Sequence, residues 1–329
     1  MKVAVLAAGA WGTALSIAFA ARHRVSLWAR EPEVVASVRE SGENRLFLPG
    51  YPLPASIVVS NDFAEVVADA ELIVVATPIA GLRFAAEQLR QLNCQVPLLW
   101  VCKGFEAGSG KLPHQVVAEV LGDAYPCGAL SGPSFAEEVA AGQPTAVTLA
   151  CRQRELARDL AANLHGGRLR LYASDDLVGV EVGGAVKNIL AIATGICDGL
   201  GLGLNARAAL MTRGLAEIAR LGQALGARRE TFMGLAGMGD LILTCTGDLS
   251  RNRRVGLGLA AGKTVEQILH DLGHVAEGVP TSREVARLST DRSIDMPITQ
   301  AVAALLDGRL NAAQAVEQLL ARDPKEELA

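Results

Sequence analysis

The chain has few aromatic residues and no strong excess of charge of either sign. Phe, Trp and Tyr make up 4% of its 329 residues, which leaves few rings on which nucleic-acid bases could stack. The formal net charge of −4 and the pI near 5.8 argue against general nucleic-acid binding. We therefore expect no nucleic-acid partner, and an RNA-binding protein that uses its arginines is a disfavoured interpretation.

The chain also lacks a CxxC pair. Its cysteines are scattered, mostly in apolar runs, which is typical of reduced, buried thiols in a cytosolic protein. The six are Cys94, Cys102, Cys127, Cys151, Cys197 and Cys245. His270 and His274 have the spacing of a metal pair, but no third ligand is apparent and Gly273 interrupts the helix between them. We predict surface histidines, no metal site and a cytoplasmic location.

No charged residue lies between Val3 and Ala21. Such a stretch is also typical of a signal peptide or a short membrane span. However, Gly9 and Gly12 lie in its middle, Lys2 is its sole positive flank, and the strand-like VSLWA follows at once. A strand, a glycine turn and a helix explain these residues better, so we predict no membrane span.

The first half of the chain alternates short apolar runs with helix-like segments such as Thr13 to Arg22, Pro32 to Ser41 and Leu82 to Leu92. Strands that are apolar on both faces and separated by helices indicate a doubly wound, mostly parallel α/β sheet of the Rossmann-like kind. We assign it to residues 1–180, with a proline-rich loop at Leu46 to Ile57. The predicted strands are Val3 to Leu6, Val25 to Trp28, Leu72 to Ala76, Leu98 to Val101, Cys127 to Leu130, Thr145 to Ala150 and Leu169 to Tyr172.

After about Val178 the strand signals fade, and residues 181–329 read as an all-helical second domain. Glycine-rich joints are expected to break it at Gly199 to Gly203, Gly234 to Gly239 and Gly256 to Gly262. The predicted helices are Val182 to Cys197, Ala206 to Leu225, Val265 to Leu272, Thr281 to Leu288, Ile298 to Leu306 and Ala312 to Leu320.

Gly9 and Gly12 lie between the first predicted strand and the first predicted helix. A dinucleotide pyrophosphate meets backbone N–H groups and a helix N-terminus at this point of a βαβ unit. Ala7 replaces the first glycine of the usual G-x-G-x-x-G pattern, so the tight turn must accept a methyl group. Cofactor binding is favoured over a purely structural turn.

Arg30 and Glu31 follow the second predicted strand, where an acid binds the ribose 2′-hydroxyl of NAD and an arginine accommodates the 2′-phosphate of NADP. Arg30 leans toward NADP, while Glu31 leaves NAD open. A solvated ion pair at the start of the second helix is a serious alternative.

Two groups of polar residues suit an anionic substrate. Lys103, Gly132 and Ser134 follow predicted strands, at the sheet edge where ligands bind. In SRNRR, Ser250 to Asn252 are expected at a helix N-terminus, where an arginine fork and free N–H groups suit a phosphate dianion. The alternative is that Arg251, Arg253 and Arg254 form a solvated basic face.

Lys187 is the only charged residue between Glu181 and Asp198. On a helix it shares a face with Gly183 and Gly184, small residues that are expected to leave room for a ligand. A desolvated ammonium is costly and usually has a function. The alternative is a side chain that snorkels to water.

Together these motifs resemble the bacterial-type NAD(P)-dependent glycerol-3-phosphate dehydrogenases along essentially the whole chain. The segments that carry the resemblance are GAWGTAL, CKGFE, SGPSFAEEVAAGQPTA, GVEVGGAVKNILAIATGICDGLGLGLNARAALMTRGL, GLAGMGDLILTCTGDLSRNRR and VAEGVPT. The resemblance implies reversible reduction of dihydroxyacetone phosphate to sn-glycerol 3-phosphate with NAD or NADP. It also implies a role in phospholipid synthesis and a homodimer.

The same resemblance implies roles for single residues. Lys187 matches the general acid and base, with Lys103, Asp240, Asn188 and Thr244 as the other residues of the reacting end. The implied substrate contacts are Lys103, Gly132, Ser134, Lys187, Asp240, Ser250, Arg251 and Asn252. The implied cofactor contacts are Gly9, Ala10, Trp11, Gly12, Arg30, Lys103, Ala136, Arg251, Val275 and Glu277. The alanines at positions 7 and 10 replace the family's usual glycine and frequent serine.

Two other functions remain open at this point. The first is another two-domain NAD(P)-dependent dehydrogenase that acts on a different hydroxy acid, in which case SRNRR needs another anionic partner. The second is a non-catalytic module that senses a nucleotide, in which case Lys187 is replaceable without chemical loss.

Overall fold

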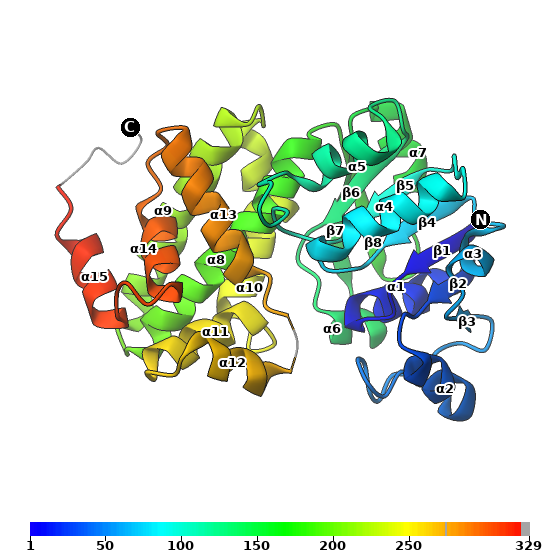
Figure 1. Ribbon diagram of the computed structural model, residues 1–329, viewed down its shortest axis with the longest axis horizontal. Coiled ribbons are helices and arrows are strands. Elements are labelled where there is room, and N and C mark those ends of the chain that lie inside the picture. The colour runs from blue at the N-terminus through cyan, green and yellow to red at the C-terminus, as the bar shows by residue number, and fades with distance from the viewer. Residues whose placement is uncertain (274, 324–329) are drawn as a thin grey trace.

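The computed structural model describes residues 1–273 and 275–323 and divides into two lobes (Figure 1). One lobe is built on an eight-stranded sheet, and the described residues of the other form helices and the turns that join them. The strands are β1 (Lys2–Leu6), β2 (Arg24–Trp28), β3 (Val58–Ser60), β4 (Leu72–Val75), β5 (Leu98–Trp100), β6 (Cys127–Ser131), β7 (Thr145–Cys151) and β8 (Leu169–Ser174).

The strand order is β3-β2-β1-β4-β5-β6-β7-β8, and β6 and β7 are the one antiparallel pair. Leu6 pairs with both Trp28 and Val75, and Val75 pairs with Trp100. The carboxyl ends of four strands therefore meet at one edge, where open α/β sheets bind their ligands. The predicted doubly wound, mostly parallel sheet is confirmed.

Seven strands lie where the apolar runs predict them, and the predicted proline-rich loop is irregular apart from one bridge between Glu43 and Pro52. The sequence did not predict β3. This strand has three residues, lies at the sheet edge, and its Val58 is 57% exposed. It is too short and too exposed to show the hydrophobic pattern of a buried strand.

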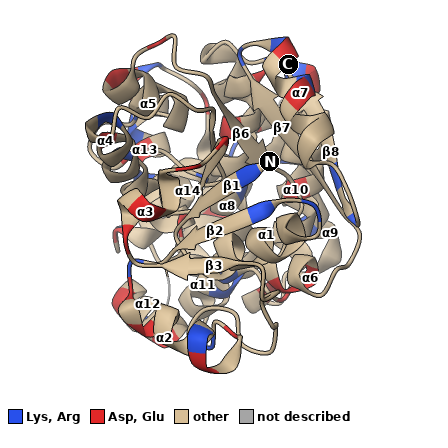
Figure 2. Cartoon of the chain, turned by 90° about the vertical axis from the view of Figure 1, so that its right-hand side faces the viewer, with Lys and Arg blue, Asp and Glu red and all other residues tan. Residues whose placement is uncertain are grey.

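Helices cover both faces of the sheet, and Figure 2 shows the charged residues mostly on the surrounding helices and loops, while β1 to β3 are largely drawn as uncharged residues. Helix α2 begins with Pro32 and is followed by Gly42, whose φ is 71°, the arrangement favoured at helix starts and ends. The helices of this lobe are α1 (Ala10–Ala20), α2 (Pro32–Ser41), α3 (Phe63–Val67), η1 (Ile79–Gly81), α4 (Leu82–Gln91), α5 (Pro113–Leu121), α6 (Ala136–Ala140) and α7 (Arg154–Leu164).

The second lobe is organised around α8 (Leu177–Gly199). Its length and composition are those of a membrane span, but 94% of its most apolar window is buried inside the protein, so it is the core helix of this lobe. The other elements of this lobe are α9 (Gly203–Ala224), η2 (Arg229–Met233), η3 (Leu235–Gly239), α10 (Asp240–Thr246), α11 (Arg251–Ala260), α12 (Val265–Leu272), α13 (Gly278–Asp291), α14 (Pro297–Leu306) and α15 (Ala312–Leu320).

The predicted glycine joints differ in structure. The first joint separates α8 from α9, as expected, and η3 occupies the second. The third break comes later than the start of the predicted joint, because α11 runs through Gly256 and ends at Ala260, followed by Gly262 with a φ of 78°. A Cβ at Gly256 would lie 2.1 Å from the carbonyl oxygen of Ile192. Gly256 therefore allows α11 to pack against α8 and does not break the helix.

The core of the helical lobe includes two residues from the connection between β5 and α5. Phe105 and Leu112 are 1% and 2% exposed and belong to the same apolar cluster as the buried face of α8. The connection between two elements of the sheet lobe is therefore packed into the helical lobe.

The cysteines are free thiols, and four of the six are buried. Burial raises the pKa of Cys127 to about 11 and the pKa of Cys245 to about 12, so these thiols are unreactive. The side chain of His270 is 91% exposed, as predicted, whereas His274 lies outside the described residues. Among the described residues, no three His, Cys, Asp or Glu side chains are grouped as metal ligands.

Ala7 has a φ of 97°, so the missing glycine of the dinucleotide turn leaves an alanine in a left-handed conformation. This conformation destabilises a residue with a Cβ by roughly 1–2 kcal/mol. Glycine removes that strain, but its greater conformational freedom in the unfolded chain reduces the gain in stability by about 0.4–1 kcal/mol. We expect Ala7→Gly to raise the free energy of unfolding by up to about 1 kcal/mol in urea titrations. Ala21→Gly is the control, because Ala21 has a φ of −61°; equal effects of both changes would contradict the strain.

Candidate active site

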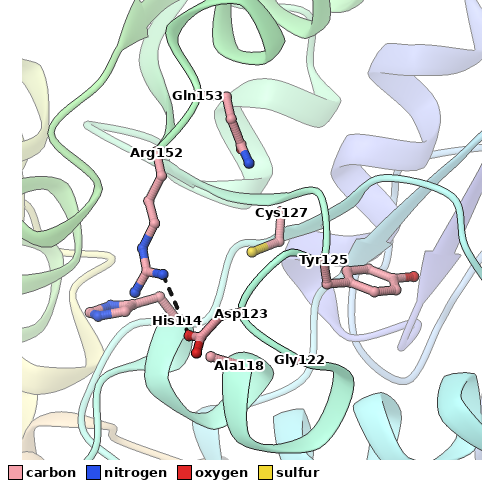
Figure 3. Close-up of a pocket in the computed structure, with 8 residues that line it drawn as sticks. All are labelled: His114, Ala118, Gly122, Asp123, Tyr125, Cys127, Arg152 and Gln153. Atoms are coloured by element: carbon pink, nitrogen blue, oxygen red, sulfur yellow. Dashed lines mark ion pairs between the residues drawn. The ribbon is translucent and has the colours of Figure 1, made fainter.

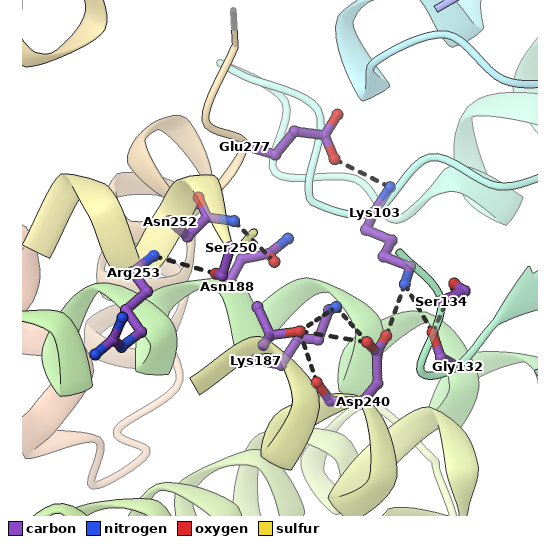
Figure 4. A network of polar contacts seen from close by, with 11 residues as sticks. Lys103, Gly132, Ser134, Lys187, Asn188, Asp240, Ser250, Asn252, Arg253 and Glu277 are labelled. Carbon is purple, nitrogen blue, oxygen red and sulfur yellow. Dashed lines mark hydrogen bonds and ion pairs between the residues drawn. The ribbon is translucent and has the colours of Figure 1, made fainter. Parts of the chain in front are cut away.

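Lys187 is buried in the middle of α8 and faces α10. Its Nζ donates to Oδ1 of Asp240 at 2.5 Å and to Oγ1 of Thr244 at 2.7 Å (Figure 4). Asp240 and Thr244 are one helical turn apart on α10, so both reach the same ammonium. The side chain of Lys187 is 7% exposed, which excludes the alternative that it snorkels to water.

Lys103 reaches the same carboxylate from the sheet edge. Its Nζ donates to Oδ2 of Asp240 at 2.6 Å and to the carbonyl oxygen of Gly132 at 3.4 Å. Ser134 donates its hydroxyl to the same carbonyl oxygen at 3.0 Å. One buried carboxylate therefore lies between two ammonium groups, and the cluster of the three side chains is positively charged overall.

The pKa of Lys187 is lowered to about 8. Burial has the largest effect, because it disfavours the charged form of the amine, and the nearby Lys103 ammonium acts in the same direction. Asp240 opposes both and keeps the amine protonated near neutral pH. Lys187 is thus able to give and to take a proton close to neutral pH.

The small residues beside Lys187 do not leave room for a ligand, so this expectation was wrong. A Cβ at Gly183 would lie 2.5 Å from the carbonyl oxygen of Ala236, and one at Gly184 would lie 2.7 Å from Oγ of Ser131. Because these glycines lack a Cβ, η3 and the end of β6 pack directly on α8. The stripe positions the walls of the site.

A second polar group lies next to Lys187 along α8 (Figure 4). Asn252 donates from its Nδ2 to Oδ1 of Asn188 at 3.0 Å and accepts from the backbone N–H of Gly278 at 3.0 Å. Ser250 is the N-cap of α11, and its side chain accepts from the N–H of Arg253 at 3.2 Å. The predicted helix N-terminus is confirmed, and its free N–H groups favour an anion.

The three arginines of SRNRR do not act as one basic face. Arg253 donates to Asp198 at 2.8 and 3.0 Å, and Arg254 donates to the carbonyl oxygen of Asp248 at 3.0 Å. Arg251 is exposed and makes a long contact of 3.4 Å with the carbonyl oxygen of Val275. Of the three, Arg251 is therefore the one held least tightly within the protein.

The dinucleotide turn has the geometry that a pyrophosphate needs. Gly9 is the N-cap of α1 with no side-chain cap, and nothing lies within 4 Å of a Cβ placed on it. A Cβ at Gly12 would lie 2.0 Å from the carbonyl oxygen of Ala7, so helix and strand pack closely there. Thr77, beyond the end of β4, has a buried hydroxyl without a partner. These features at the carboxyl edge fit a dinucleotide.

The other residues of the cofactor prediction lie in several elements. Trp11 in α1 and Ala136 at the start of α6 pack against one small apolar cluster, and Val275 is exposed. Glu277 accepts backbone N–H groups from Ile79 at 3.0 Å and from Lys103 at 3.3 Å. Burial raises the pKa of this carboxyl group.

Arg30 and Glu31 form the ion pair that the sequence left open. The guanidinium donates to Oε1 of Glu31 at 2.7 and 3.0 Å, and the side chain of Arg30 is 79% exposed. Arg30 is therefore available at the sheet edge, but Glu31 competes for it.

A separate cavity beside His114 in α5 is too small for a ligand (Figure 3). Its volume is about 10 Å³, which holds one water molecule. The lining residues are His114, Ala118, Gly122, Asp123, Tyr125, Cys127, Arg152 and Gln153. It has no place in the site around Lys187.

Two family models together cover most of this chain. Residues 2–157 match the N-terminal model and residues 176–317 the C-terminal model of the NAD-dependent glycerol-3-phosphate dehydrogenases. The chain belongs to this family. It is therefore an NAD(P)-dependent oxidoreductase, which confirms the resemblance and the cofactor class predicted from the sequence.

Relatives of the glycerol-3-phosphate dehydrogenase family match the chain over its whole length. A protein of Dechloromonas aromatica named glycerol-3-phosphate dehydrogenase [NAD(P)+] is 72% identical over 329 residues, which covers both chains fully. A protein of the same name from Aromatoleum aromaticum is 58% identical over 328 residues and covers 99% of this chain and 100% of its own. The crystal structure of the family member from Coxiella burnetii has a TM-score of 0.93 at 43% identity and covers 98% of this chain and 99% of its own. A ketopantoate reductase from Ralstonia eutropha, at 17% identity and a TM-score of 0.60, shares only the fold.

The sequence singled out the residues that bear the strongest chemistry and missed those that hold them in place. The structure brings Lys103, Gly132, Ser134, Lys187, Asp240 and Thr244 together, with Asn188, Ser250 and Asn252 alongside. No sequence motif pointed to Asp198, which binds Arg253, or to Glu284, which accepts a backbone N–H from the segment after Lys103. Glu284 follows Glu277 at a seven-residue spacing on one helix, and this spacing was the available signal.

We expect Glu31→Gln to raise the preference for NADP over NAD by up to about fivefold, because breaking an exposed ion pair costs at most about 1 kcal/mol. Arg30→Asp should shift the preference toward NAD. Both are measured as cofactor dissociation constants by titration calorimetry. Glu33→Gln removes the same charge from the exposed first turn of α2, and an equal effect of this control would mean that net charge, not the ion pair, sets the preference.

Proposed function

We propose that this protein reduces dihydroxyacetone phosphate to sn-glycerol 3-phosphate with NADH or NADPH, reversibly. The observation that carries the proposal is the buried Lys187, which shares Asp240 with Lys103 and lies close to the helix N-terminus of α11. We divide the work between residues 1–180, which bind the cofactor, and residues 181–329, which provide the proton and most substrate contacts.

Lys187 is the general acid of the reduction. Hydride is what the reduced cofactor supplies when bound. As the ketone oxygen gains negative charge, Lys187 stabilises it and donates a proton from Nζ. Asp240 and Thr244 orient the ammonium through the two hydrogen bonds described above. In the oxidation direction the neutral amine of Lys187 is the base, and a pKa of about 8 allows both directions.

The N-terminus of α11 holds the phosphate. Arg251 contributes a guanidinium fork, and Ser250 and Asn252 lie at the free N–H groups of the helix. Asn188 links this end to Lys187 through its bond to Asn252. Binding at the phosphate then orients the distant ketone carbon, so remote binding energy contributes to the rate.

We further propose that the protein is a cytoplasmic homodimer that supplies the glycerol backbone of phospholipids. The free, mostly buried cysteines support a reducing compartment. The homodimer and the metabolic role rest on the family resemblance.

Lys187→Met is expected to lower kcat by roughly 10²- to 10⁴-fold, the range for the loss of a general acid. The dissociation constants for NADH and NADPH should stay nearly unchanged, because Lys187 bonds to Asp240 and Thr244 of α10 and is not one of the predicted cofactor contacts. Steady-state kinetics with dihydroxyacetone phosphate and cofactor titrations measure both. A near-normal kcat would rule out the assignment.

Arg251→Ala is expected to raise the KM for dihydroxyacetone phosphate by about tenfold or more, since a charge-assisted bond to phosphate contributes roughly 1.5–3 kcal/mol. Arg254→Ala removes a neighbouring exposed arginine that is bound to Asp248, and this control should leave the KM within about twofold. If the wild-type protein reduces unphosphorylated dihydroxyacetone as well as dihydroxyacetone phosphate, the assignment of a phosphate site to the N-terminus of α11 is wrong.

A further inference from the structure

The segment that carries Lys103 is fastened to the helical lobe through its backbone. Lys103 and Gly108 donate their N–H groups to Glu277 at 3.3 Å and to Glu284 at 2.7 Å. Both acceptors belong to the α13 side of the helical lobe. We call residues 103–112 the Lys103 segment. It starts three residues after β5 and ends where α5 begins.

The side chains of α13 and its N-cap that meet the segment lie on one face. Glu277, Thr281 and Glu284 are spaced by four and three residues, so they lie along the same side of the helix. Thr281 packs against Gly104, where a Cβ would lie 2.8 Å from its Oγ1, and the φ of Gly104 is 141°. The helix therefore lies directly on the segment's backbone, an approach that glycine permits.

Apolar packing joins the segment to the same lobe. Phe105 and Leu112, the large apolar side chains of the segment, are in the core around α8. Polar contacts back to the sheet lobe include the ion pair of Glu106 with Arg83 at 2.8 and 2.9 Å, in which the Arg83 side chain is 32% exposed. Two more are the exposed ion pair of Lys111 with Glu119 at 2.7 Å and the long contact of Lys103 Nζ with the carbonyl oxygen of Gly132 at 3.4 Å. Burial of two large side chains contributes more than a partly exposed ion pair.

We propose that Glu284 is a positioning residue that, with Glu277 and Thr281, fixes the Lys103 segment to the helical lobe. Lys103, Asp240 and Lys187 then form one preassembled unit before cofactor and substrate bind. The inference rests on the proposed function in one respect, namely that Lys103 and Lys187 act in the reaction.

The pH dependence of kcat/KM distinguishes a positioning role of Glu284 from a purely stabilising one. Among the described residues, Asp240, Thr244 and Lys103 face Lys187, and the buried Cys245 thiol of α10 also interacts with it. Lys103 lowers the pKa of Lys187. If the segment loosens, Lys103 moves away, and the pKa of Lys187 rises toward that of an ordinary lysine. The pH at which kcat/KM for reduction declines then moves upward.

The test compares Glu284→Ala with two controls on the full-length protein. Glu284→Gln keeps a carbonyl acceptor for the Gly108 N–H, and Arg287→Ala removes the surface partner that Glu284 binds at 2.8 Å. We expect Glu284→Ala to lower kcat/KM for dihydroxyacetone phosphate by about tenfold, the scale of a small misplacement. The pH above which its kcat/KM for reduction declines should move upward, and both controls should stay within about twofold of wild type. Glu284→Ser replaces Glu284→Ala if the latter does not fold.

Amide hydrogen exchange of residues 103–112 gives a readout that does not depend on turnover. Faster exchange in Glu284→Ala, but not in Glu284→Gln, supports the attachment. Unchanged exchange overturns the attachment. Faster exchange with unchanged kcat/KM and an unchanged pH dependence overturns the positioning role. If wild-type protein does not reduce dihydroxyacetone phosphate, the proposed function fails, while the exchange data still decide the attachment.

Discussion

The structure depends on one buried carboxylate that is shared by two lysines. Asp240 is 1% exposed, and isolated charges at such depth are strongly disfavoured. Two ammonium groups, each at hydrogen-bond distance, compensate its charge. Because two ammonium groups share one carboxylate, the cluster carries one positive charge in excess, and the pKa of Lys187 within it is about 8. A ketone oxygen that becomes negative meets that charge where water is scarce, so the interaction is strong.

The two lobes supply this cluster from opposite sides. Asp240 and Lys187 come from α10 and α8, whereas Lys103 comes from the carboxyl edge of the sheet. Glycines allow the necessary approach: Gly184 on α8 has no room for a Cβ beside Ser131. The Ser131 side chain at the end of β6 therefore lies against the core helix, and the lysine from the sheet edge reaches the helical carboxylate without a long, flexible loop.

Much of the fold follows from sequence because its signals are local. Apolar runs located seven strands, and Ser250 predicted the N-terminus of α11. The sequence singled out the solitary Lys187 but left open whether it is buried or snorkels to water, and the structure buries it. The resemblance named Asp240 and Thr244, which the structure places on Lys187. These features lie within one element or one motif, so a linear sequence displays them.

What the sequence did not predict depends on contacts between distant elements. Arg253 looked like part of a basic face until Asp198, 55 positions away, was found to bind it. Gly183 and Gly184 suggested open space, but the backbone of η3 and the end of β6 fill it. No local pattern reports whether a small residue faces a ligand or another segment, because both environments favour the absence of a side chain.

The central claim is that Lys187 is the proton donor and acceptor and that its surroundings hold its pKa near 8. The most direct test is kcat/KM as a function of pH in both directions of the reaction, which reports groups of the free protein. The account predicts that reduction declines as pH rises through about 8 and that oxidation declines as pH falls through the same value. Profiles that stay flat across this range, or that change in the same direction, would contradict it.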